Sequence, residues 1–495
     1  MSTLTAQLLR RRLAVIAAGA AAVALVAGAG PAAAQARTPA RTAGGARAVA
    51  GRAWGAAEEV PGTAALNAGG NAGVNSVSCP SAGNCSAGGW YAVSPGLHQT
   101  FVVSQVHGTW GTAAEVPGSA ALNAGGFALI NAVSCASAGD CSAAGQYLDS
   151  SLHYQALVAT QDLGTWHKAI EVPGTGALNA GGFAGAFPLS CASAGNCATG
   201  GFYEDSAGHF HGFVASQVHS RWNTAIEVPG PAGGGIVSAV SCAPAGPCTA
   251  SGGYTDSTGH TQAYVVRAVN GTWGNAKQVP GTAALNQGGR AAASSMSCPS
   301  AGNCAAGGTY TDSAGHTQAF IASQARGIWH NAEEIPGLAT LNTGGSAGFH
   351  SGSLSSASAG NCAAGGSYTD SAGHTQAFVV TQVNGTWHPA IEVPGTAALN
   401  TGGNAGFGSV SCPTAGNCTA GGTYTDSAGH TQIFVLSQVN GTWRTAKEVP
   451  GTPALNTGGN AKINTISCAP AGTCTAGGGY ADSASHQQAF LVNKT

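Results

Sequence analysis

The sequence predicts an all-β fold, an eight-bladed β-propeller with four-stranded antiparallel blades, and three observations carry this prediction. A unit recurs with a nearly constant period, which indicates a solenoid, a propeller or an array. Each unit holds four β-forming stretches separated by turn residues. The chain begins with a lone fourth strand and ends after a third strand, so the N-terminal strand can join the last blade and close the ring. The period is marked by Trp54, Trp110, Trp166, Trp222, Trp273, Trp329, Trp387 and Trp443.

The four strands are clearest in the unit that runs from Trp387 to Asn440. The first strand ends at Cys412, the second runs from Cys418 to Tyr424, the third covers residues 432–439, and the fourth follows at 442–449. Asn-Gly between the third and fourth strands is the signal of a two-residue hairpin, and Asp-Ser-Ala-Gly marks the turn before the third. Helix is not expected, because Gly and Pro interrupt every few residues and no apolar 3.6-residue period persists. A β-helix is the alternative architecture, although its coils need no Asn-Gly turns.

The N-terminus has the pattern of a secretory signal over residues 1–36. Three arginines at 10–12 precede an uncharged run at 13–30, and a small-residue stretch with Ala34 and Ala36 follows, as in signal peptides. Residues 37–50 are expected to be a flexible linker, which leaves 51–495 for the propeller. A retained membrane anchor is the alternative, but the run is rich in Ala and Gly and only weakly apolar. A twin-arginine export route stays open. We therefore expect a secreted, extracellular protein with no stable membrane insertion after cleavage.

The composition argues against some classes of binding partner. Charged residues make up 7% of the chain and the net charge is −2, which indicates neither a nucleic-acid surface nor a polyanion-binding surface. The 78 glycines lie at repeated positions between apolar segments, as expected for turns in a folded array. The Ala- and Gly-rich, Lys-poor usage is typical of an actinobacterial proteome. The mature protein is expected to be a monomer.

Cysteine spacing predicts local disulfides. Fourteen of the fifteen cysteines form Cys-x5-Cys pairs at the first hairpin of a unit, where facing residues are near enough to bridge. The sixth unit has Ser356 in the first position and leaves Cys362 alone. In an exported chain such pairs are expected to be oxidised, each contributing about 2–3 kcal/mol at most. Zinc binding is the alternative, but zinc sites favour shorter spacings. The predicted pairs are Cys79/Cys85, Cys135/Cys141, Cys191/Cys197, Cys242/Cys248, Cys298/Cys304, Cys412/Cys418 and Cys468/Cys474.

One face of the propeller carries the candidate binding residues. The turn between the second and third strands and the loop that leads to the next unit emerge on the same face, opposite the disulfides. An Asp and a His recur in that turn in seven units, and an Asn recurs in the loop. They could bind a repetitive glycan, a cell-wall polymer or calcium; alternatively, Asp caps its own turn while His and Gln pack over the neighbouring blade. No other cofactor is expected. The residues are Asp149, Asp205, Asp256, Asp312, Asp370, Asp426 and Asp482 with His153, His209, His260, His316, His374, His430 and His486.

Some units depart from the pattern, and an enzyme site would be sought there. The fourth unit lacks the Leu-Asn-x-Gly-Gly loop at 228–236, and the first unit replaces Asp with Val93, near Trp90. The third unit gathers Glu204, His209 and His211 around its turn. This set could serve as a metal or acid–base site, with a solvated hairpin tip as the alternative.

The turn-bearing blades resemble the Asp-box propellers of the sialidase and BNR-repeat type. The segment 425–431 has one extra residue between Asp and Gly, and Gln-x-Phe stands where the box has its Trp. The resemblance implies a fold and not an activity. Sialidase chemistry needs an arginine triad, and four of the five arginines beyond Arg52 lie in or beside the third-to-fourth-strand hairpins, on the opposite face. No Gly-x-Ser-x-Gly elbow, His-Glu-x-x-His motif or P-loop occurs.

These observations predict a secreted, non-enzymatic β-propeller that binds an extracellular partner through its loop-rich face, with a glycan or cell-wall polymer as the first candidate and a protein as the second. A propeller hydrolase or lyase acting on polysaccharide, with its site near the fourth unit, is the alternative. A structural surface scaffold is a third reading.

Overall fold

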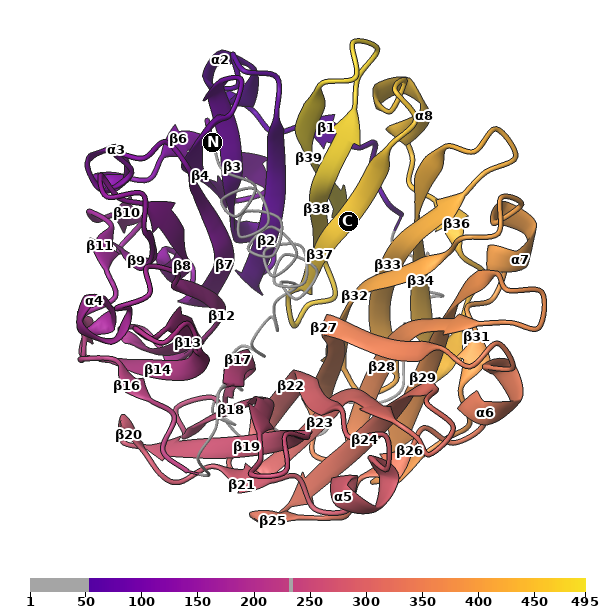
Figure 1. Ribbon diagram of the computed structural model, residues 1–495. Helices are drawn as coiled ribbons and strands as arrows, with labels where there is room; N and C mark the ends of the chain where they lie inside the picture. The colour runs from indigo at the N-terminus through magenta and orange to yellow at the C-terminus, as the bar shows by residue number, and fades with distance from the viewer. Residues whose placement is uncertain (1–52, 231–234) are drawn as a thin grey trace, which may run out of the picture.

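A computed structural model of the protein describes residues 53–230 and 235–495. Eight antiparallel sheets lie around a central axis like the blades of a propeller (Figure 1), which confirms the predicted fold class. The predicted signal at 1–36 and linker at 37–50 lie outside the described residues. Among the described residues, no helix is long and apolar enough to cross a membrane.

The innermost and second strands of the blades form hairpins around the axis. The innermost strands are β2 (Ala72–Ser81), β7 (Ala128–Ser137), β12 (Gly185–Ser193), β17 (Gly235–Cys242), β22 (Ala291–Ser300), β27 (Ala347–Ser358), β32 (Gly406–Thr414) and β37 (Ala461–Cys468). The second strands are β3 (Asn84–Ser94), β8 (Asp140–Leu148), β13 (Asn196–Glu204), β18 (Cys248–Thr255), β23 (Asn303–Thr311), β28 (Asn361–Thr369), β33 (Asn417–Thr425) and β38 (Cys474–Ala481).

The third strand and two short outer strands complete each blade. The third strands are β4 (Leu97–Val106), β9 (Tyr154–Asp162), β14 (Phe210–Val218), β19 (Thr261–Val269), β24 (Thr317–Ala325), β29 (Thr375–Val383), β34 (Thr431–Val439) and β39 (Gln487–Lys494). The outer pairs are β5 (Thr109–Trp110) and β6 (Ala114–Glu115), β10 (Thr165–Trp166) and β11 (Ile170–Glu171), β15 (Arg221–Trp222) and β16 (Ile226–Glu227), β20 (Thr272–Trp273) and β21 (Lys277–Gln278), β25 (Ile328–Trp329) and β26 (Glu333–Glu334), β30 (Thr386–Trp387) and β31 (Ile391–Glu392), and β35 (Thr442–Trp443) and β36 (Lys447–Glu448). We number the blades 1–8 from β2 to β37.

The ring closes as predicted. Blade 8 lacks outer strands of its own, and β1 (Glu58–Glu59) from the N-terminal end pairs antiparallel with β39. Trp54 adds a bridge to Lys494. Closure removes the two free edges that an open array of eight blades would expose.

The fourth strand differs from the single strand that the sequence suggested. In blade 1 it divides into β5 and β6, because the backbone N–H of Ala113 between them donates to the carbonyl of Pro61 in the preceding unit at 2.7 Å. The same bond recurs at each seam between blades, for example from Ala446 to Pro394. The middle of the outer strand is therefore hydrogen-bonded to the neighbouring blade and not to its own sheet.

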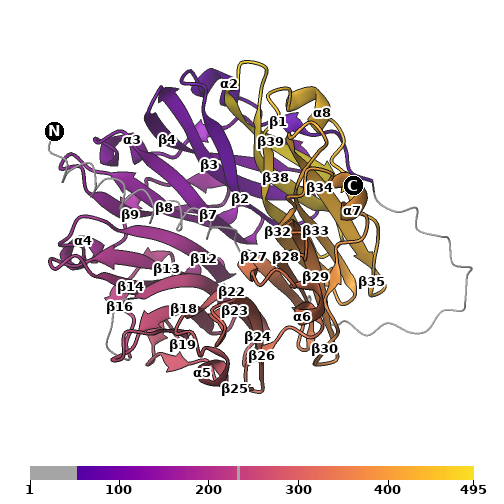
Figure 2. The same cartoon turned by 45° about the vertical axis from the view of Figure 1, so that its right-hand side comes forward.

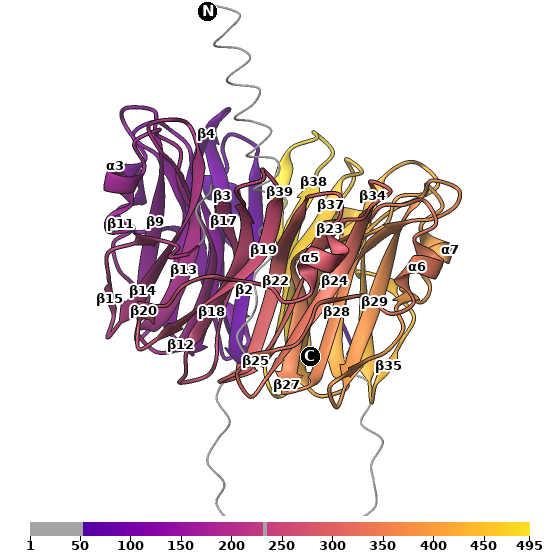
Figure 3. The same ribbon diagram turned by 60° about the horizontal axis from the view of Figure 1, so that its bottom comes forward.

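Short helices, which the sequence pattern did not predict, lie on the outer flank of the ring (Figure 3). Each is a single four-residue turn that follows Pro-Gly, and Ala and Leu are good helix formers. In the first, Gly62 has φ +88° and the hydroxyl of Thr63 donates to the carbonyl of Val60 at 2.7 Å. The helices are α2 (Thr63–Leu66), α3 (Ser119–Leu122), α4 (Thr175–Leu178), α5 (Thr282–Leu285), α6 (Leu338–Leu341), α7 (Thr396–Leu399) and α8 (Thr452–Leu455).

Hydrophobic side chains fill the space between neighbouring blades. A phenylalanine of the third strand, such as Phe101 or Phe490, is fully buried in each of six blades, and Leu157 takes this position in blade 2. The facing second strand carries glycine because a Cβ at Gly89 would lie 1.9 Å from the Gly73 carbonyl oxygen and 3.1 Å from the Phe101 ring. The glycine two residues before the tyrosine, such as Gly89, is thus required by close strand packing.

All seven predicted disulfides are formed, with Cα–Cα distances of 3.8–4.1 Å. Cys362 is free and buried, and its Sγ contacts the Ser356 hydroxyl. The bonded pairs are Cys79–Cys85, Cys135–Cys141, Cys191–Cys197, Cys242–Cys248, Cys298–Cys304, Cys412–Cys418 and Cys468–Cys474.

The bonded cysteines face each other across the hairpin, as expected. In blade 2, Cys135 and Cys141 are register partners. In blade 5, Ser297 pairs with Ala305, and the next residues along, Cys298 and Cys304, are bonded with their Cα atoms 4.1 Å apart. Cys141 and Cys304 are both buried, so these bonds hold the hairpin together inside the fold.

The predicted hairpin turns between the third and outer strands are also confirmed. Asn270 and Gly271 have φ of +51° and +79°, as a type I′ hairpin requires. Asn384 and Asn440 have positive φ as well. The Asn-Gly signal therefore identified this turn correctly.

Candidate functional site

The two faces of the ring carry the connections that the sequence predicted. Gly108, in the turn between the third and outer strands, donates to Gly83 in the turn between the first two strands at 2.8 Å. On the other face, Gly125 in the loop after α3 donates to Leu148 at the end of β8 at 2.9 Å. We call this second face, which holds the Asp-His turns and the loops after α2–α8, the loop face.

The aspartates of the loop face stabilise their own turns. In blade 8, Oδ1 of Asp482 accepts the backbone N–H groups of Ala484 and His486, both at 2.9 Å, and Oδ2 accepts Nε2 of Gln488 at 2.9 Å. Partial burial opposes ionisation, but the hydrogen bonds from Gln488 and the His486 backbone outweigh it and lower the pKa of Asp482. Both oxygens are therefore used within the fold. The same pattern holds at Asp149, Asp256, Asp312, Asp370 and Asp426.

The recurring loop asparagine joins neighbouring blades. Nδ2 of Asn67 donates to Oε1 of Gln488 in blade 8 at 2.9 Å, and its Oδ1 accepts the Ala92 backbone N–H of blade 1 at 3.2 Å. Together with the Asp482–Gln488 bond, this makes a chain of side-chain hydrogen bonds across the seam. Equivalent Asn–Gln pairs occur at other seams, such as Asn456 with Gln432 at 3.0 Å. The asparagines thus have a structural role.

The histidines pack over the next loop but stay accessible. The His486 ring lies over Gly70, where a Cβ would approach its Cδ2 to 2.8 Å. Its Nδ1 is 3.8 Å from Oδ2 of Asp482, and the side chain is 57% exposed. The other six predicted histidines are exposed as well. Six of the seven rings pack in this way over a glycine of the neighbouring blade's loop, as in the alternative interpretation, while much of each ring faces solvent.

A continuous run of aromatic rings crosses blades 1–3, the indigo to magenta part of Figure 2. Neighbouring ring centroids are 5.1–5.9 Å apart, and most pairs are edge-to-face, a favourable geometry for aromatic side chains. Six of the eight rings are half-buried and two are buried. We call this set the aromatic arc: Trp90, His98, Phe127, Tyr154, Phe183, Phe187, Phe202 and Phe210.

Equivalent positions in blades 4–8 hold small or polar residues. The bridge between His98 and Phe127 corresponds, for example, to the bridge between Thr431 and Asn460. The sequence pattern singled out Trp90 alone. An alignment of the eight units would have shown that aromatic residues replace the usual ones at these positions. Only the fold shows that the positions lie side by side. The place of Trp90 and Phe202, directly before the tyrosine of the second strand, is taken by Gly253, Thr309, Ser367, Thr423 and Gly479.

The unusual side chains of blade 3 meet in a different combination from the Glu204, His209 and His211 that the sequence suggested. Nε2 of His211 lies 3.1 Å from Oδ2 of Asp205, and its Nδ1 lies 3.0 Å from Oε1 of Glu227. The ring stacks on Tyr203 with centroids 5.2 Å apart. His211 stands where other units have Gln, next to the loop that the fourth unit lacks. Hydrogen bonds from the His209 backbone N–H and from the His211 ring outweigh the desolvation of Asp205 and lower its pKa to about 2.

Sequence reasoning missed Glu227 because its position recurs in most units. Elsewhere this glutamate is structural: Glu171 accepts the Tyr147 hydroxyl at 3.1 Å and the Gly176 backbone N–H at 2.9 Å. Within residues 53–230 and 235–495, no three His, Cys, Asp or Glu side chains are grouped so that they could hold a metal ion.

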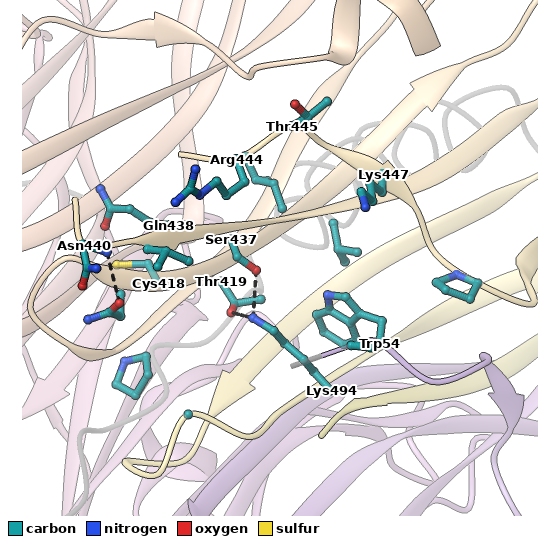
Figure 4. A pocket seen from close by; sticks show the side chains of 18 of the residues that line it. Trp54, Cys418, Thr419, Ser437, Gln438, Asn440, Arg444, Thr445, Lys447 and Lys494 are labelled. Atoms are coloured by element: carbon teal, nitrogen blue, oxygen red, sulfur yellow. Dashed lines mark hydrogen bonds between the residues drawn. The ribbon is translucent and has the colours of Figure 1, made fainter. Parts of the chain in front are cut away.

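A cavity of about 950 Å³ lies at the seam between blades 7 and 8 (Figure 4). Blade 7 contributes Arg444 and Lys447, and blade 8 contributes Trp54 and Lys494. Turn residues such as Asn440 place it toward the disulfide-bearing face. It is therefore separate from the loop face.

Comparisons with known proteins give distant matches to other propellers. No protein-family model and no curated protein matches the chain. Similar solved structures include a xyloglucanase from Xanthomonas campestris (13% identity, 87% of this chain, 60% of that chain, TM-score 0.46). Others are an ulvan lyase (11%, 89% and 94%, 0.40) and a Hadza microbial sialidase (12%, 69% and 73%, 0.34). The structural neighbours thus include sialidase-like and other carbohydrate-active propellers, whereas Asp-box repeats are not confirmed.

Proposed function

We propose that the protein is a secreted, monomeric propeller that binds a carbohydrate through its loop face, with the aromatic arc as the main contact surface. One observation carries this proposal: substitutions that break the repeat lie next to one another in space, over blades 1–3. Five other blades fold with Gly, Ser, Thr, Asn, Gln or Arg at these positions, so the blade does not need the rings. Clustered and partly exposed aromatic side chains are typical of ligand contacts.

The chemistry of the arc suits an uncharged sugar. Burial lowers the pKa of His98 and raises the pKa of Tyr154, so both side chains are neutral near pH 7. Flat rings offer apolar faces to the C–H groups of a sugar, while Tyr and His keep a polar edge for its hydroxyls. Nδ2 of Asn71, 3.4 Å from Nε2 of His98, adds an amide at one end of the arc.

The predicted ring of turn residues has a secondary part in this proposal. We assign the Asp side chains to shaping the turns, because their oxygens are engaged by backbone and Gln donors. The exposed His side chains are secondary contacts for a long glycan that extends beyond the arc. Seven disulfides suit the oxidising surroundings of an exported protein.

Polysaccharide cleavage is the second candidate function. The observation that favours it is the Asp205–His211–Glu227 arrangement, in which an imidazole has a carboxylate at each ring nitrogen. A histidine held in this way can transfer a proton. A hydrolase or lyase would then use blade 3, next to Phe202 and Phe210 of the arc.

A binding assay with matched variants tests both functions. The full chain is incubated with insoluble neutral polysaccharides and with purified cell wall, and the supernatant is analysed for released sugars. Phe127→Asn with Tyr154→Thr places in blade 2 the residues that other blades use, and the control changes Asn404 and Thr431 to Ala at the equivalent positions of blade 7. We expect binding to weaken about tenfold or more in the first variant and to stay unchanged in the second. Equal binding by both would overturn the assignment of the arc, and release of fragments that His211→Gln abolishes would establish cleavage.

A further inference from the structure

The seam cavity gathers positive charge on a protein that has little. Arg444, Lys447 and Lys494 line it, although the whole chain has 17 Lys and Arg among 495 residues. Among the described residues that line it, the one carboxylate is that of Glu448, which is hydrogen-bonded to the Tyr424 hydroxyl. Within the described residues, Arg444 and Lys447 form no ion pair with any carboxylate. The lining therefore favours an anionic group.

Lys494 replaces a glutamine of the repeat and keeps its hydrogen bond to the neighbouring blade. In blade 2, Nε2 of Gln161 donates to the Ser104 hydroxyl of blade 1 at 3.2 Å. In blade 8, Nζ of Lys494 donates to the equivalent Ser437 hydroxyl of blade 7 at 2.8 Å and to Thr419 at 3.0 Å (Figure 4). In other blades the neutral amide of a glutamine makes this hydrogen bond, so the fold does not require a charged side chain here.

The other two cations are also departures from the repeat. The position of Arg444, directly after the tryptophan, holds Gly, His or Asn in the other six blades where it follows a third strand. The position of Lys447 holds Ile in three blades, and Lys277 is its counterpart in blade 4. Lys277 lines none of the described cavities, which makes it a matched control.

The wall opposite Arg444 and Lys447 offers a flat surface. Trp54 lies beside Lys494 in Figure 4, and its side chain is half-buried. Side-chain amides of Asn417 and Asn440 and the Thr445 hydroxyl complete the lining. An aromatic face together with amides and hydroxyls suits a sugar ring and its hydroxyl groups, and the cations suit an acidic substituent.

A similar cavity at another seam is less cationic. Between blades 2 and 3, a cavity of about 510 Å³ is lined by Lys168, Arg221 and Trp222 and by one carboxylate, that of Asp162. Two cations accompany one carboxylate there, whereas three accompany the carboxylate of Glu448 at the seam of blades 7 and 8. The third cation is therefore a property of that seam and not of the repeat.

We propose that the seam cavity binds an acidic sugar, whose carboxylate or sulfate contacts Arg444, Lys447 and Lys494 and whose ring packs against Trp54. The planar guanidinium of Arg444 can bind a carboxylate or sulfate with two hydrogen bonds. Three cations in one cavity suit a single acidic residue of a chain. The site is independent of the aromatic arc and stands even if the proposed function of the loop face fails.

Calorimetric titration of the full chain tests the proposal with three probes: an oligogalacturonate, a neutral oligoglucan and inorganic sulfate. Lys494→Gln, Arg444→Asn and Lys447→Ile each use a residue that the repeat itself has at that position, so the fold should be kept, and circular dichroism checks it. We expect the oligogalacturonate to bind, its affinity to fall with added salt, and each variant to weaken it about tenfold. Lys277→Ile and the arc variant Phe127→Asn with Tyr154→Thr should bind it as the wild type does.

Three results would overturn the proposal. The first is no binding of the oligogalacturonate to the wild type. The second is equal loss in Lys277→Ile, which would place the binding elsewhere. The third is sulfate binding as tightly as the oligosaccharide, which would leave a simple anion site without a sugar contact.

Discussion

Replacing Ser356 with Cys should create an eighth disulfide and stabilise blade 6. Ser356 and Cys362 are directly paired across the first hairpin of that blade, as Cys191 and Cys197 are in blade 3. The bridged pairs have Cα–Cα distances of 3.8–4.1 Å, and the Cys362 thiol already contacts the Ser356 side chain. No backbone movement is needed to form the bond.

The expected increase in the free energy of unfolding follows from the length of the loop that the disulfide closes. All seven existing bonds join cysteines six positions apart, and closing a loop of this size in the unfolded chain is worth about 2 kcal/mol by the chain-entropy relation. We expect the urea midpoint of Ser356→Cys to rise accordingly if blade 6 unfolds with the rest of the ring. Ser356→Ala serves as the control, because it changes the same contact without a bond.

Thiol titration decides the result. Wild-type protein should show one thiol after denaturation and none before, because burial raises the pKa of Cys362 to about 12 despite the opposing hydrogen bond with Ser356. The raised pKa keeps the thiol neutral in the native state, so its contribution to stability is present below the ordinary thiol pKa and is lost as pH rises toward 12. Ser356→Cys should show no thiol even when denatured. Two free thiols in this variant, or a midpoint no higher than that of Ser356→Ala, would refute the pairing.

Other predictions concern the loop face. Asp426→Ala should lower thermal stability, because it removes the acceptor of two backbone N–H groups and of the Gln432 amide. Glycan binding should change less than about twofold. A loss of binding without a loss of stability would make this Asp a ligand contact. Because the turn aspartates have lowered pKa values, their stabilisation is present above the ordinary Asp pKa and is lost as pH falls below it, and an acid titration followed by circular dichroism should show this loss below about pH 4. Gly459→Ala should destabilise by at least about 1 kcal/mol in urea unfolding, because Gly459 has φ +74° and a Cβ would lie 2.5 Å from the His430 ring. Trp90→Thr should weaken neutral-glycan binding severalfold while the melting temperature stays within a few degrees, as Thr309 occupies that place in blade 5.

The architecture was predictable because each strand-forming stretch is copied eight times. Asn-Gly turns, the Asp turn and the cysteine spacing each specify a local geometry, and the lone strand at the start has one place left to pair. The short helices were not predictable from apolar periodicity, since one turn after Pro-Gly is too short to show a period. The division of the outer strand depends on the bond from Ala113 to Pro61, which joins different units and leaves no mark in either one.

The candidate sites were less predictable for a related reason. A motif search favours residues that recur, and Asp482, Gln488 and Asn67 recur because most seams use their hydrogen bonds. The rings of the aromatic arc and the cations of the seam cavity stand at positions where most other units have different residues. Their meaning depends on which columns of the repeat meet in space, and this is known only once the blades are assembled.

The positions at which the units differ explain how such a fold can acquire binding sites at little cost. The fully buried Phe101 and its counterparts fill the space between blades and are nearly constant, because a smaller residue would leave a cavity. Trp90 and Lys494 are on the same framework, yet equivalent positions accept Thr or Gln. A change there alters the surface of one blade without disturbing the packing of its neighbours. Eight copies of each position are therefore eight independent places to change. The arc over blades 1–3 and the cationic seam of blades 7 and 8 are two regions where several such changes lie together, and contiguity of this kind is the signal that separates a binding site from scattered variation.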